Sequence, residues 1–262
     1  MDNQNIIFLL IGLIFVLFLI YYIFIKSSSG LISFVDLNNK NDYVSINSLP
    51  ASSSTNYSYS SWINVNTWSN NKKILFTRNN IDYTKYVAYN NKINPVVNQN
   101  IITYNHTDVA SSPMYDFILR LDDKTPTLYC SFKTPSASSS HIAYEYILTK
   151  NFPIQKWTFV VIVLDGINLD FYLDGKITYS VKMLDIPSPT SANLFFGNNS
   201  SSNYLANDIY LANVSVWNYS LDPQTVWRQY IGGSGQSSPT NNYKMQISAS
   251  QDNNKYKLVS FP

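Results

Sequence analysis

The sequence predicts an all-β fold, an antiparallel jelly-roll sandwich, with one N-terminal transmembrane helix and one short C-terminal helix. Three observations predict it. Short segments rich in Tyr, Ile, Val and Phe recur between turn-forming residues along most of the 262-residue chain. Two Asp-Gly pairs separate such segments, as in tight hairpin turns. Near the N-terminus lies a run of twenty residues without a charge, which is long enough to cross a bilayer as a helix.

The apolar run, Ile6–Ile25, is interpreted as a membrane anchor that comprises residues 1–26. A cleaved signal peptide is the alternative, but it would have a basic start and a shorter apolar stretch. The first five residues here contain no Lys or Arg. Tyr21, Tyr22 and Lys26 end the run, as suits the headgroup layer, so the lipid bilayer is the first expected partner. Residues 27–41 are predicted to be a flexible linker.

The side of the membrane is harder to assign. Lys26 and Lys40 follow the run and no Lys or Arg precedes it, so the positive-inside bias places the large domain on the cytoplasmic side. Glycosylation triplets favour the opposite side, although a chain so rich in Asn and Ser produces them by chance. These triplets begin at Asn56, Asn105, Asn198, Asn199, Asn213 and Asn218.

The strands of the predicted domain, residues 42–231, follow one another at the spacing of a sandwich or barrel. Residues 57–65 alternate apolar and polar, which predicts a half-buried strand. Residues 157–164 are continuously apolar, which predicts a strand covered on both faces. The predicted strands are 41–46, 57–65, 72–78, 115–122, 127–132, 142–148, 157–164, 169–175, 176–184, 193–197 and 209–218.

One helix is predicted after the last strand, at residues 221–230, with Asp222 as N-cap and Pro223 at its first position. Residues 232–262 are predicted to form a Gly/Ser linker and a polar arm. Within the arm, residues 241–250 and 254–262 alternate like strands. We expect them to add to a sheet edge, on this chain or on a partner.

The stretch LDGINLDFYLDGK, residues 164–176, contains three aspartates within ten residues. The pairs Asp165-Gly166 and Asp174-Gly175 are interpreted as two-residue type I′ turns, because both central residues of such a turn need positive φ. They lie at opposite ends of one strand, more than about 20 Å apart at roughly 3.3 Å per residue, so they do not share a metal. A calcium or ligand contact at one of them is the minor alternative.

The run FPIQKWTFVVIVLDGINLDFYLDGK, together with the segments before and after it, resembles the laminin G-like jelly roll of the concanavalin A-type lectins and glucanases. The resemblance covers residues 42–230 and implies their two-sheet sandwich. The sequence departs from the family at two places. Asn207 and Asp208 stand where the family usually has a glycine before the closing strand, and a long polar insertion separates Arg78 from Met114.

Chemistry that would indicate an enzyme is not evident. Glucanases of this fold need two carboxylates on one strand, written Glu-x-Asp-x-x-Glu. This chain has one glutamate, Glu145, interpreted as an exposed strand position. His106 and His141 lack partners at metal-ligand spacing. The single cysteine, Cys130, is interpreted as a small core residue and permits no disulfide within the chain. We therefore expect no catalysis, no cofactor and no resident metal.

Two functions of different class remain. The first is a structural module that tethers a membrane to a protein coat such as a viral capsid. The composition, the anchor and the cysteine-poor jelly roll together resemble minor capsid or membrane proteins of large DNA viruses with an internal membrane. Charged residues are only 13% of the chain and the net charge is +2, so nucleic acid is not an expected partner.

The alternative is a membrane-anchored glycan-binding module, such as a cell-surface adhesion protein. In it, tyrosines of the insertion would stack on sugar rings. Packing of the insertion onto the sandwich is the simpler explanation of the same residues. The tyrosines are Tyr83, Tyr86, Tyr89 and Tyr104.

Overall fold

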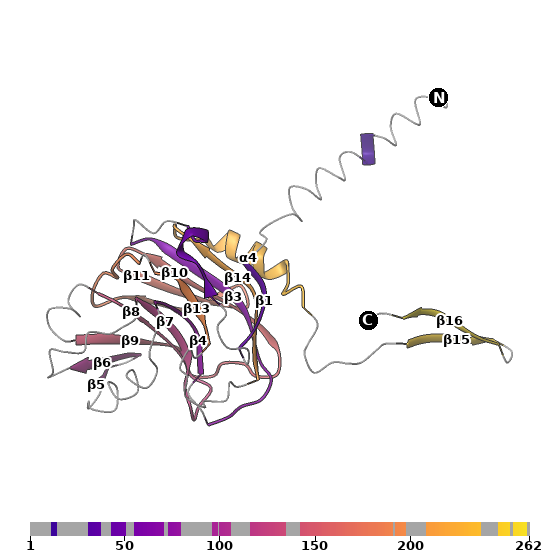
Figure 1. Cartoon of the computed structure of the whole chain (residues 1–262), viewed down its shortest axis with the longest axis horizontal. Coiled ribbons are helices and arrows are strands. Elements are labelled where there is room, and N and C mark those ends of the chain that lie inside the picture. The colour runs from indigo at the N-terminus through magenta and orange to yellow at the C-terminus, as the bar shows by residue number, and fades with distance from the viewer. Residues whose placement is uncertain are drawn as a thin grey trace.

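The chain forms a sandwich of two antiparallel sheets (Figure 1). The computed structural model describes residues 12–14, 31–37, 43–50, 55–70, 73–79, 96–98, 100–105, 116–134, 142–190, 192–197, 208–236, 246–251 and 254–260. The all-β class and the two-sheet architecture predicted from the sequence are confirmed.

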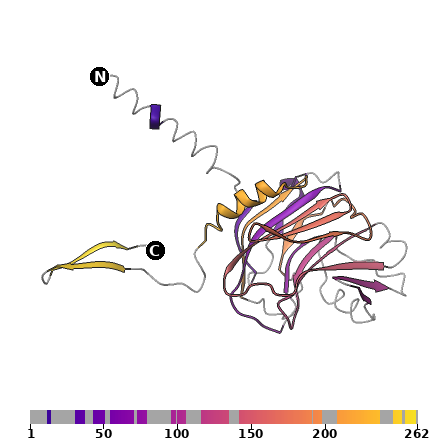
Figure 2. The same cartoon turned by 180° about the vertical axis from the view of Figure 1, so that it is seen from behind.

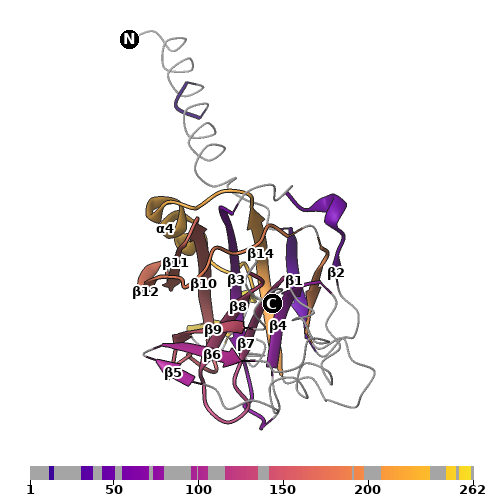
Figure 3. The same cartoon turned by 90° about the vertical axis from the view of Figure 1, so that its left-hand side faces the viewer.

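The first sheet has six strands in the order β1-β14-β3-β10-β11-β12. Figure 3 shows them side by side, from β12 on the left to β1 on the right. The hairpin β10–β11–β12 at one side is continuous in sequence, whereas β3 and β14 bring together segments more than 140 residues apart. The strands are β1 (Ile32–Asp36), β3 (Tyr57–Val65), β10 (Trp157–Asp165), β11 (Asn168–Leu173), β12 (Lys176–Lys182) and β14 (Ile209–Trp217).

The second sheet has eight strands in the order β2-β13-β4-β7-β8-β9-β6-β5. Its two edge strands, β2 and β5, are among its shortest, which limits the unpaired backbone at each edge. A 3₁₀ turn, η1 (Ile46–Ser48), follows β2. The strands are β2 (Tyr43–Val44), β4 (Lys73–Arg78), β5 (Val96–Asn98), β6 (Ile101–Asn105), β7 (Phe117–Leu121), β8 (Leu128–Phe132), β9 (Ile142–Thr149) and β13 (Leu194–Phe196).

The main core lies between the two sheets, where alternate residues of each strand point inward. Tyr57 and Tyr59 of β3 project into it from the six-stranded sheet, and Phe117 of β7 meets them from the other. The rings of Tyr59 and Phe117 stack with centroids 4.5 Å apart. Aromatic contact between the layers therefore fixes β3 against β7.

The strand β3 is buried along its whole length, so the prediction that it would be half-buried is wrong. Its outward residues, which include Ser60 and Trp62, are covered because α4 (Pro223–Ile231) lies on the outer face of this sheet (Figure 1). The predicted helix is thereby confirmed. Its N-cap is Asp222, whose Oδ1 accepts a hydrogen bond of 2.9 Å from the amide of Thr225.

Three strands lie where the sequence predicted none. β1 lies within residues 27–41, which were predicted to be linker, yet Ile32 pairs with Val214 and Asp36 with Tyr210 in the six-stranded sheet. The sandwich thus begins at least ten residues earlier than predicted. β5 and β6 lie in the polar insertion and extend the eight-stranded sheet beyond β9.

The two turns of the β10–β11–β12 hairpin differ from each other. Asp174 and Gly175 are the central residues of the second turn, with φ of 48° and 76°, which suits the predicted type I′ turn. In the first turn, Asp165 instead ends β10 and pairs with Asn168. The loop residues there are Gly166 (φ 60°) and Ile167, so its predicted position was wrong by one residue.

The two chain ends were predicted to hold an anchor and an arm. The anchor, Ile6–Ile25, lies outside the described residues except for a helical stretch at 12–14. Among the helices that the structure describes, none has the length and apolar character to span a bilayer. In the arm, β15 (Gln246–Gln251) and β16 (Asn254–Ser260) pair with each other as a separate two-stranded sheet (Figure 2).

The second hairpin turn yields a test of the fold. A Cβ at Gly175 would lie 2.8 Å from Cε3 of Trp227, whereas one at Gly166 would meet nothing within 4 Å. Both glycines have positive φ, which costs an L-residue about 1–2 kcal/mol. Gly175→Ala adds overpacking of about 1–3 kcal/mol and should therefore destabilise the protein more than Gly166→Ala. Thermal unfolding in detergent measures both, and equal losses would contradict the packing of α4 against this turn.

Candidate functional site

The outer face of the six-stranded sheet, beneath α4, is the first candidate site. Trp62 lies at its centre, with ring centroids 5.1 Å from Phe159 and 5.7 Å from Tyr230. Val226 of α4 is fully buried against this group. The helix is thus held by a second apolar cluster, separate from the core between the sheets.

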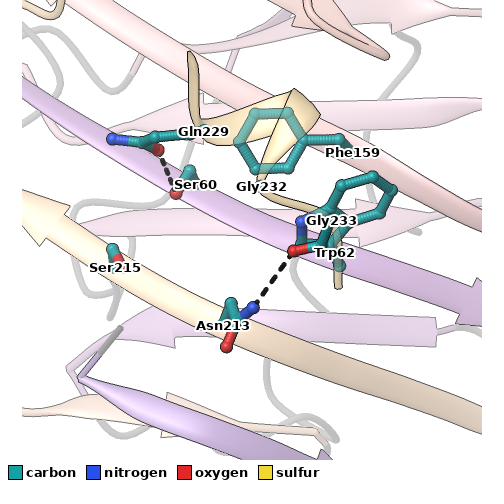
Figure 4. Close-up of a pocket in the computed structure, with 8 residues that line it drawn as sticks. All are labelled: Ser60, Trp62, Phe159, Asn213, Ser215, Gln229, Gly232 and Gly233. Carbon is teal, nitrogen blue, oxygen red and sulfur yellow. Dashed lines mark hydrogen bonds between the residues drawn. The ribbon is translucent and has the colours of Figure 1, made fainter. Parts of the chain in front are cut away.

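A small cavity opens beside this cluster (Figure 4). Its volume is about 60 Å³, room for a few water molecules, whereas pockets for drug-sized ligands measure about 300–1,000 Å³. Two hydrogen bonds lie along it: Ser60 Oγ to Gln229 Oε1 at 3.4 Å, and Asn213 Nδ2 to the carbonyl of Gly233 at 3.3 Å. It is lined by Ser60, Trp62, Phe159, Asn213, Ser215, Gln229, Gly232 and Gly233.

Asn213 has a structural role in this cavity. It adopts a positive φ of 48° where the pairing of β14 with β3 shifts register between Ala212 and Ser215. Its side-chain amide donates to the carbonyls of both Gly233 and Ser234, the latter at 3.0 Å. A bulge with Asn at positive φ therefore fastens the chain that leaves α4 to the sheet.

The second candidate is an ion pair in the eight-stranded sheet. Arg120 of β7 donates from Nε and Nη2 to the two carboxylate oxygens of Glu145 on β9, at 2.7 and 2.6 Å. Its guanidinium also lies 4.2 Å from the ring centroid of Tyr129, on the strand between them. Glu145 is only 1% exposed, so its interpretation as an exposed strand position is wrong.

This arrangement fixes what Glu145 can do. Both carboxylate oxygens of Glu145 accept hydrogen bonds from the guanidinium of Arg120, so they are occupied within the sheet, whereas a glycosidase acid must contact its substrate. Removing one charge of a buried pair leaves the other uncompensated. The only glutamate of the chain is therefore part of the structural framework of the sheet.

Buried polar groups also occur inside the core. Arg78 is 1% exposed, and its Nε donates to the carbonyl of Ala192 at 2.9 Å. Burial raises the pKa of Tyr59 to about 12 and that of Tyr57 well above its ordinary value. Both phenols are thus neutral at physiological pH and act as core side chains.

Cys130 lies in the core, fully buried, as predicted. Burial raises the pKa of its thiol well above the ordinary value. Since the thiolate is the nucleophilic form, this cysteine is unreactive.

The aspartates of the hairpin are engaged in local contacts. Asp174 Oδ1 accepts from the amide of Phe159 at 2.9 Å, and its Oδ2 lies 3.1 Å from Lys156 Nζ. Asp170 Oδ1 accepts from the hydroxyl of Ser180 at 2.5 Å. Throughout the described ranges, no three His, Cys, Asp or Glu side chains gather as a metal-binding cluster.

The predicted tyrosine site falls largely beyond what the structure describes. Tyr83, Tyr86 and Tyr89 lie outside the described residues, as do His106 and His141. Tyr104 belongs to β6, where its backbone alone is described. A sugar-stacking role for these tyrosines stays a prediction.

Comparison with known proteins identifies the family. A laminin G family model, described as "Concanavalin A-like lectin/glucanases superfamily", matches residues 38–227. The match covers well over half of the chain, so the chain belongs to this superfamily. The resemblance inferred from the sequence is confirmed. Among curated proteins, none is similar enough to count as a match.

Solved structures give more distant similarities. The receptor-binding domain of botulinum neurotoxin type G is 12% identical, with a TM-score of 0.44 over 78% of this chain and 51% of that chain. The receptor-binding domain of botulinum neurotoxin mosaic serotype C/D is 13% identical, with a TM-score of 0.42 over 68% of this chain and 36% of that chain. A Trypanosoma rangeli sialidase in complex with sialic acid is 10% identical, with a TM-score of 0.40 over 67% of this chain and 22% of that chain.

In each of these comparisons, the chain spans less than two thirds of the other protein's length. No ligand or activity is transferred from proteins so distant.

The buried ion pair yields a second test. Glu145→Gln should destabilise the protein by about 3–5 kcal/mol, because it leaves the guanidinium of Arg120 buried without its counter-charge. Replacing both residues, as Arg120→Met with Glu145→Leu, should recover most of that loss, since an apolar pair of similar volume needs no counter-charge. Urea unfolding measures each variant. A Glu145→Gln protein as stable as the parent would contradict this prediction, because it would show that the buried guanidinium of Arg120 needs no counter-charge.

Proposed function

We propose that this chain is a membrane-anchored, non-enzymatic interaction module that holds a membrane to a neighbouring protein layer, such as a viral capsid. The apolar run Ile6–Ile25 supports the anchor, since its length matches the hydrocarbon core. Only five residues separate Ile25 from Leu31, the first described residue of the sandwich. Such a short tether suits a protein that holds two layers close together.

The open edge strand β12 carries the proposal of a protein partner. It is the longest edge strand of the sandwich, and all seven of its residues are at least partly exposed. In the described part of the chain, no strand pairs with its outer side. Ile177, at 53% exposure, adds an apolar side chain to that edge. At this edge, an extended segment of a partner protein can pair with the backbone of β12 and contact the side chain of Ile177.

The chemistry of the described residues supports a role without catalysis. Glu145 is paired with Arg120, and Cys130 is buried with a raised thiol pKa. Asp174 serves a turn. The groups that a hydrolase or a nucleophilic enzyme would employ are thus occupied in holding the sandwich together.

The anchor is tested by deletion. Removal of residues 1–26 should release a soluble protein, because the remaining chain contains no second apolar run of spanning length. The measurement is partition between membrane and supernatant, with the full chain as control. If the shortened protein still sediments with membrane after a high-salt wash, the single anchor is wrong.

The partner surface is tested at Ile177. Chemical cross-linking of the full chain in its native membrane should recover a protein partner, and Ile177→Asp should lower that yield at least several-fold by placing a charge on the pairing edge. Ile154→Asp is the matched control, since Ile154 is 46% exposed but lies outside β12. Equal loss in both variants, or in neither, would contradict recognition through this edge.

Glycan binding is the alternative that a separate measurement decides. The protein comprising residues 27–262, which retains β1, should show no binding above background on a broad glycan array, with or without calcium. Stacked tyrosines are worth about 0.5–1.5 kcal/mol each, so a lectin would lose roughly tenfold in affinity when two are removed. Specific oligosaccharide binding that is lost in Tyr83→Ala, Tyr86→Ala or Tyr104→Ala would replace the proposed function with a lectin.

A further inference from the structure

We propose that one end of the sandwich lies against the lipid bilayer, namely the end where β14 stops and the loop 218–222 leads into α4. This end is called the proximal end; Leu164, Asp165, Lys182 and Tyr219 lie there. The inference rests on the proposed anchor and goes beyond it, because it fixes which surface faces lipid.

The pairing of β1 determines where the N-terminal chain arrives. β1 is antiparallel to β14, with Ile32 opposite Val214 and Asp36 opposite Tyr210. The start of β1 therefore lies beside the end of β14. Followed from Ile32 back to Leu31, the chain continues towards the end at which β14 reaches Trp217. The segment that connects the anchor to the sandwich enters from the proximal end.

The length of that segment disfavours the opposite orientation. Five residues lie between Ile25 and Leu31, which makes six steps of at most about 3.6 Å, so these two Cα atoms are at most roughly 22 Å apart. A nine-residue strand such as β3 is about 30 Å long at 3.3 Å per residue. Leu31 precedes Ile32, which pairs with Val214, so it lies about 20 Å from the far end, where Val65 pairs with Ile209. The far end therefore meets the bilayer only if the whole segment is fully extended, whereas the proximal end meets it with the segment relaxed.

The proximal end presents apolar side chains on a fixed loop. Tyr219 is 53% exposed and Leu184 is 56% exposed. The carbonyl of Tyr219 accepts from Ser58 Oγ at 2.9 Å, and the hydroxyl of Ser220 donates to the carbonyl of Leu164 at 2.7 Å. Leu184 follows β12 at the same end of the sheet, since the amide of the adjacent Met183 donates to the carbonyl of Ile167 in the first hairpin turn.

Such side chains suit the headgroup layer, where an aromatic ring with a polar tip is favoured. The exposed charges at this end include Asp165 and Asp222 as well as Lys182. They give the surface no net attraction to anionic lipid. The contact is therefore imposed by the short tether and should be insensitive to salt.

Single-cysteine labelling tests this orientation. The native Cys130 is fully buried and its thiol pKa is raised, so it does not compete for label. Tyr219→Cys and, independently, Leu184→Cys place a fluorophore at the proximal end. Ile154→Cys is the matched control at the far end, where the amide of the adjacent Gln155 donates to the carbonyl of Val65.

The full chain is reconstituted in phosphatidylcholine vesicles, some of whose headgroups carry a nitroxide quencher. Quenching should be several-fold stronger at positions 219 and 184 than at 154, and unchanged by high salt. Equal quenching, or stronger quenching at 154, in protein that floats with the vesicles would overturn the orientation while leaving the anchor intact. Failure of the full chain to float would overturn the anchor, and the orientation with it.

Discussion

The structure depends on the burial of one strand, β3, on both of its faces. Tyr57, Tyr59 and Ile63 point into the core between the sheets, and Trp62 points outward into the cluster beneath α4. Backbone pairing with β10 and β14 places the same strand in the middle of the six-stranded sheet. Both apolar clusters therefore meet at β3, and neither is complete without it.

Part of this arrangement was predictable from the sequence. The positions of most strands along the chain, the helix α4 and the Asp174-Gly175 turn follow from local patterns of periodicity and turn chemistry. The burial of both faces of β3 does not, because alternation with serine normally indicates solvent. Ser58 instead donates to the carbonyl of Tyr219 and accepts from the amide of Leu221, contacts across more than 160 residues. No local feature of the β3 sequence indicates these two hydrogen bonds.

The candidate site was less predictable for the same reason. Glu145 lies in a polar-alternating strand, and its partner Arg120 is 25 residues away on a strand that is not its neighbour. β1 was missed because five residues after a serine-rich stretch carry little pattern of their own until β14 pairs with them. β6 was missed because the polar composition of the insertion favoured a loop. In each case a tertiary partner decides the structure, and a single sequence does not identify that partner.

Glu145, Arg120 and Cys130 are buried within the sandwich, whereas the backbone edge of β12 and single apolar side chains such as Ile177 are exposed. Such a division suits a module that binds through its surface. Because both apolar clusters meet at β3, the cluster beneath α4 should unfold together with the core as one cooperative unit. Native-state hydrogen exchange of the β3 amides in the Val226→Ala protein tests this most directly. We expect the free energy of opening of these amides to fall by about 2 kcal/mol along the whole strand, together with that of the α4 amides. Faster exchange confined to α4, with β3 unchanged, would contradict it.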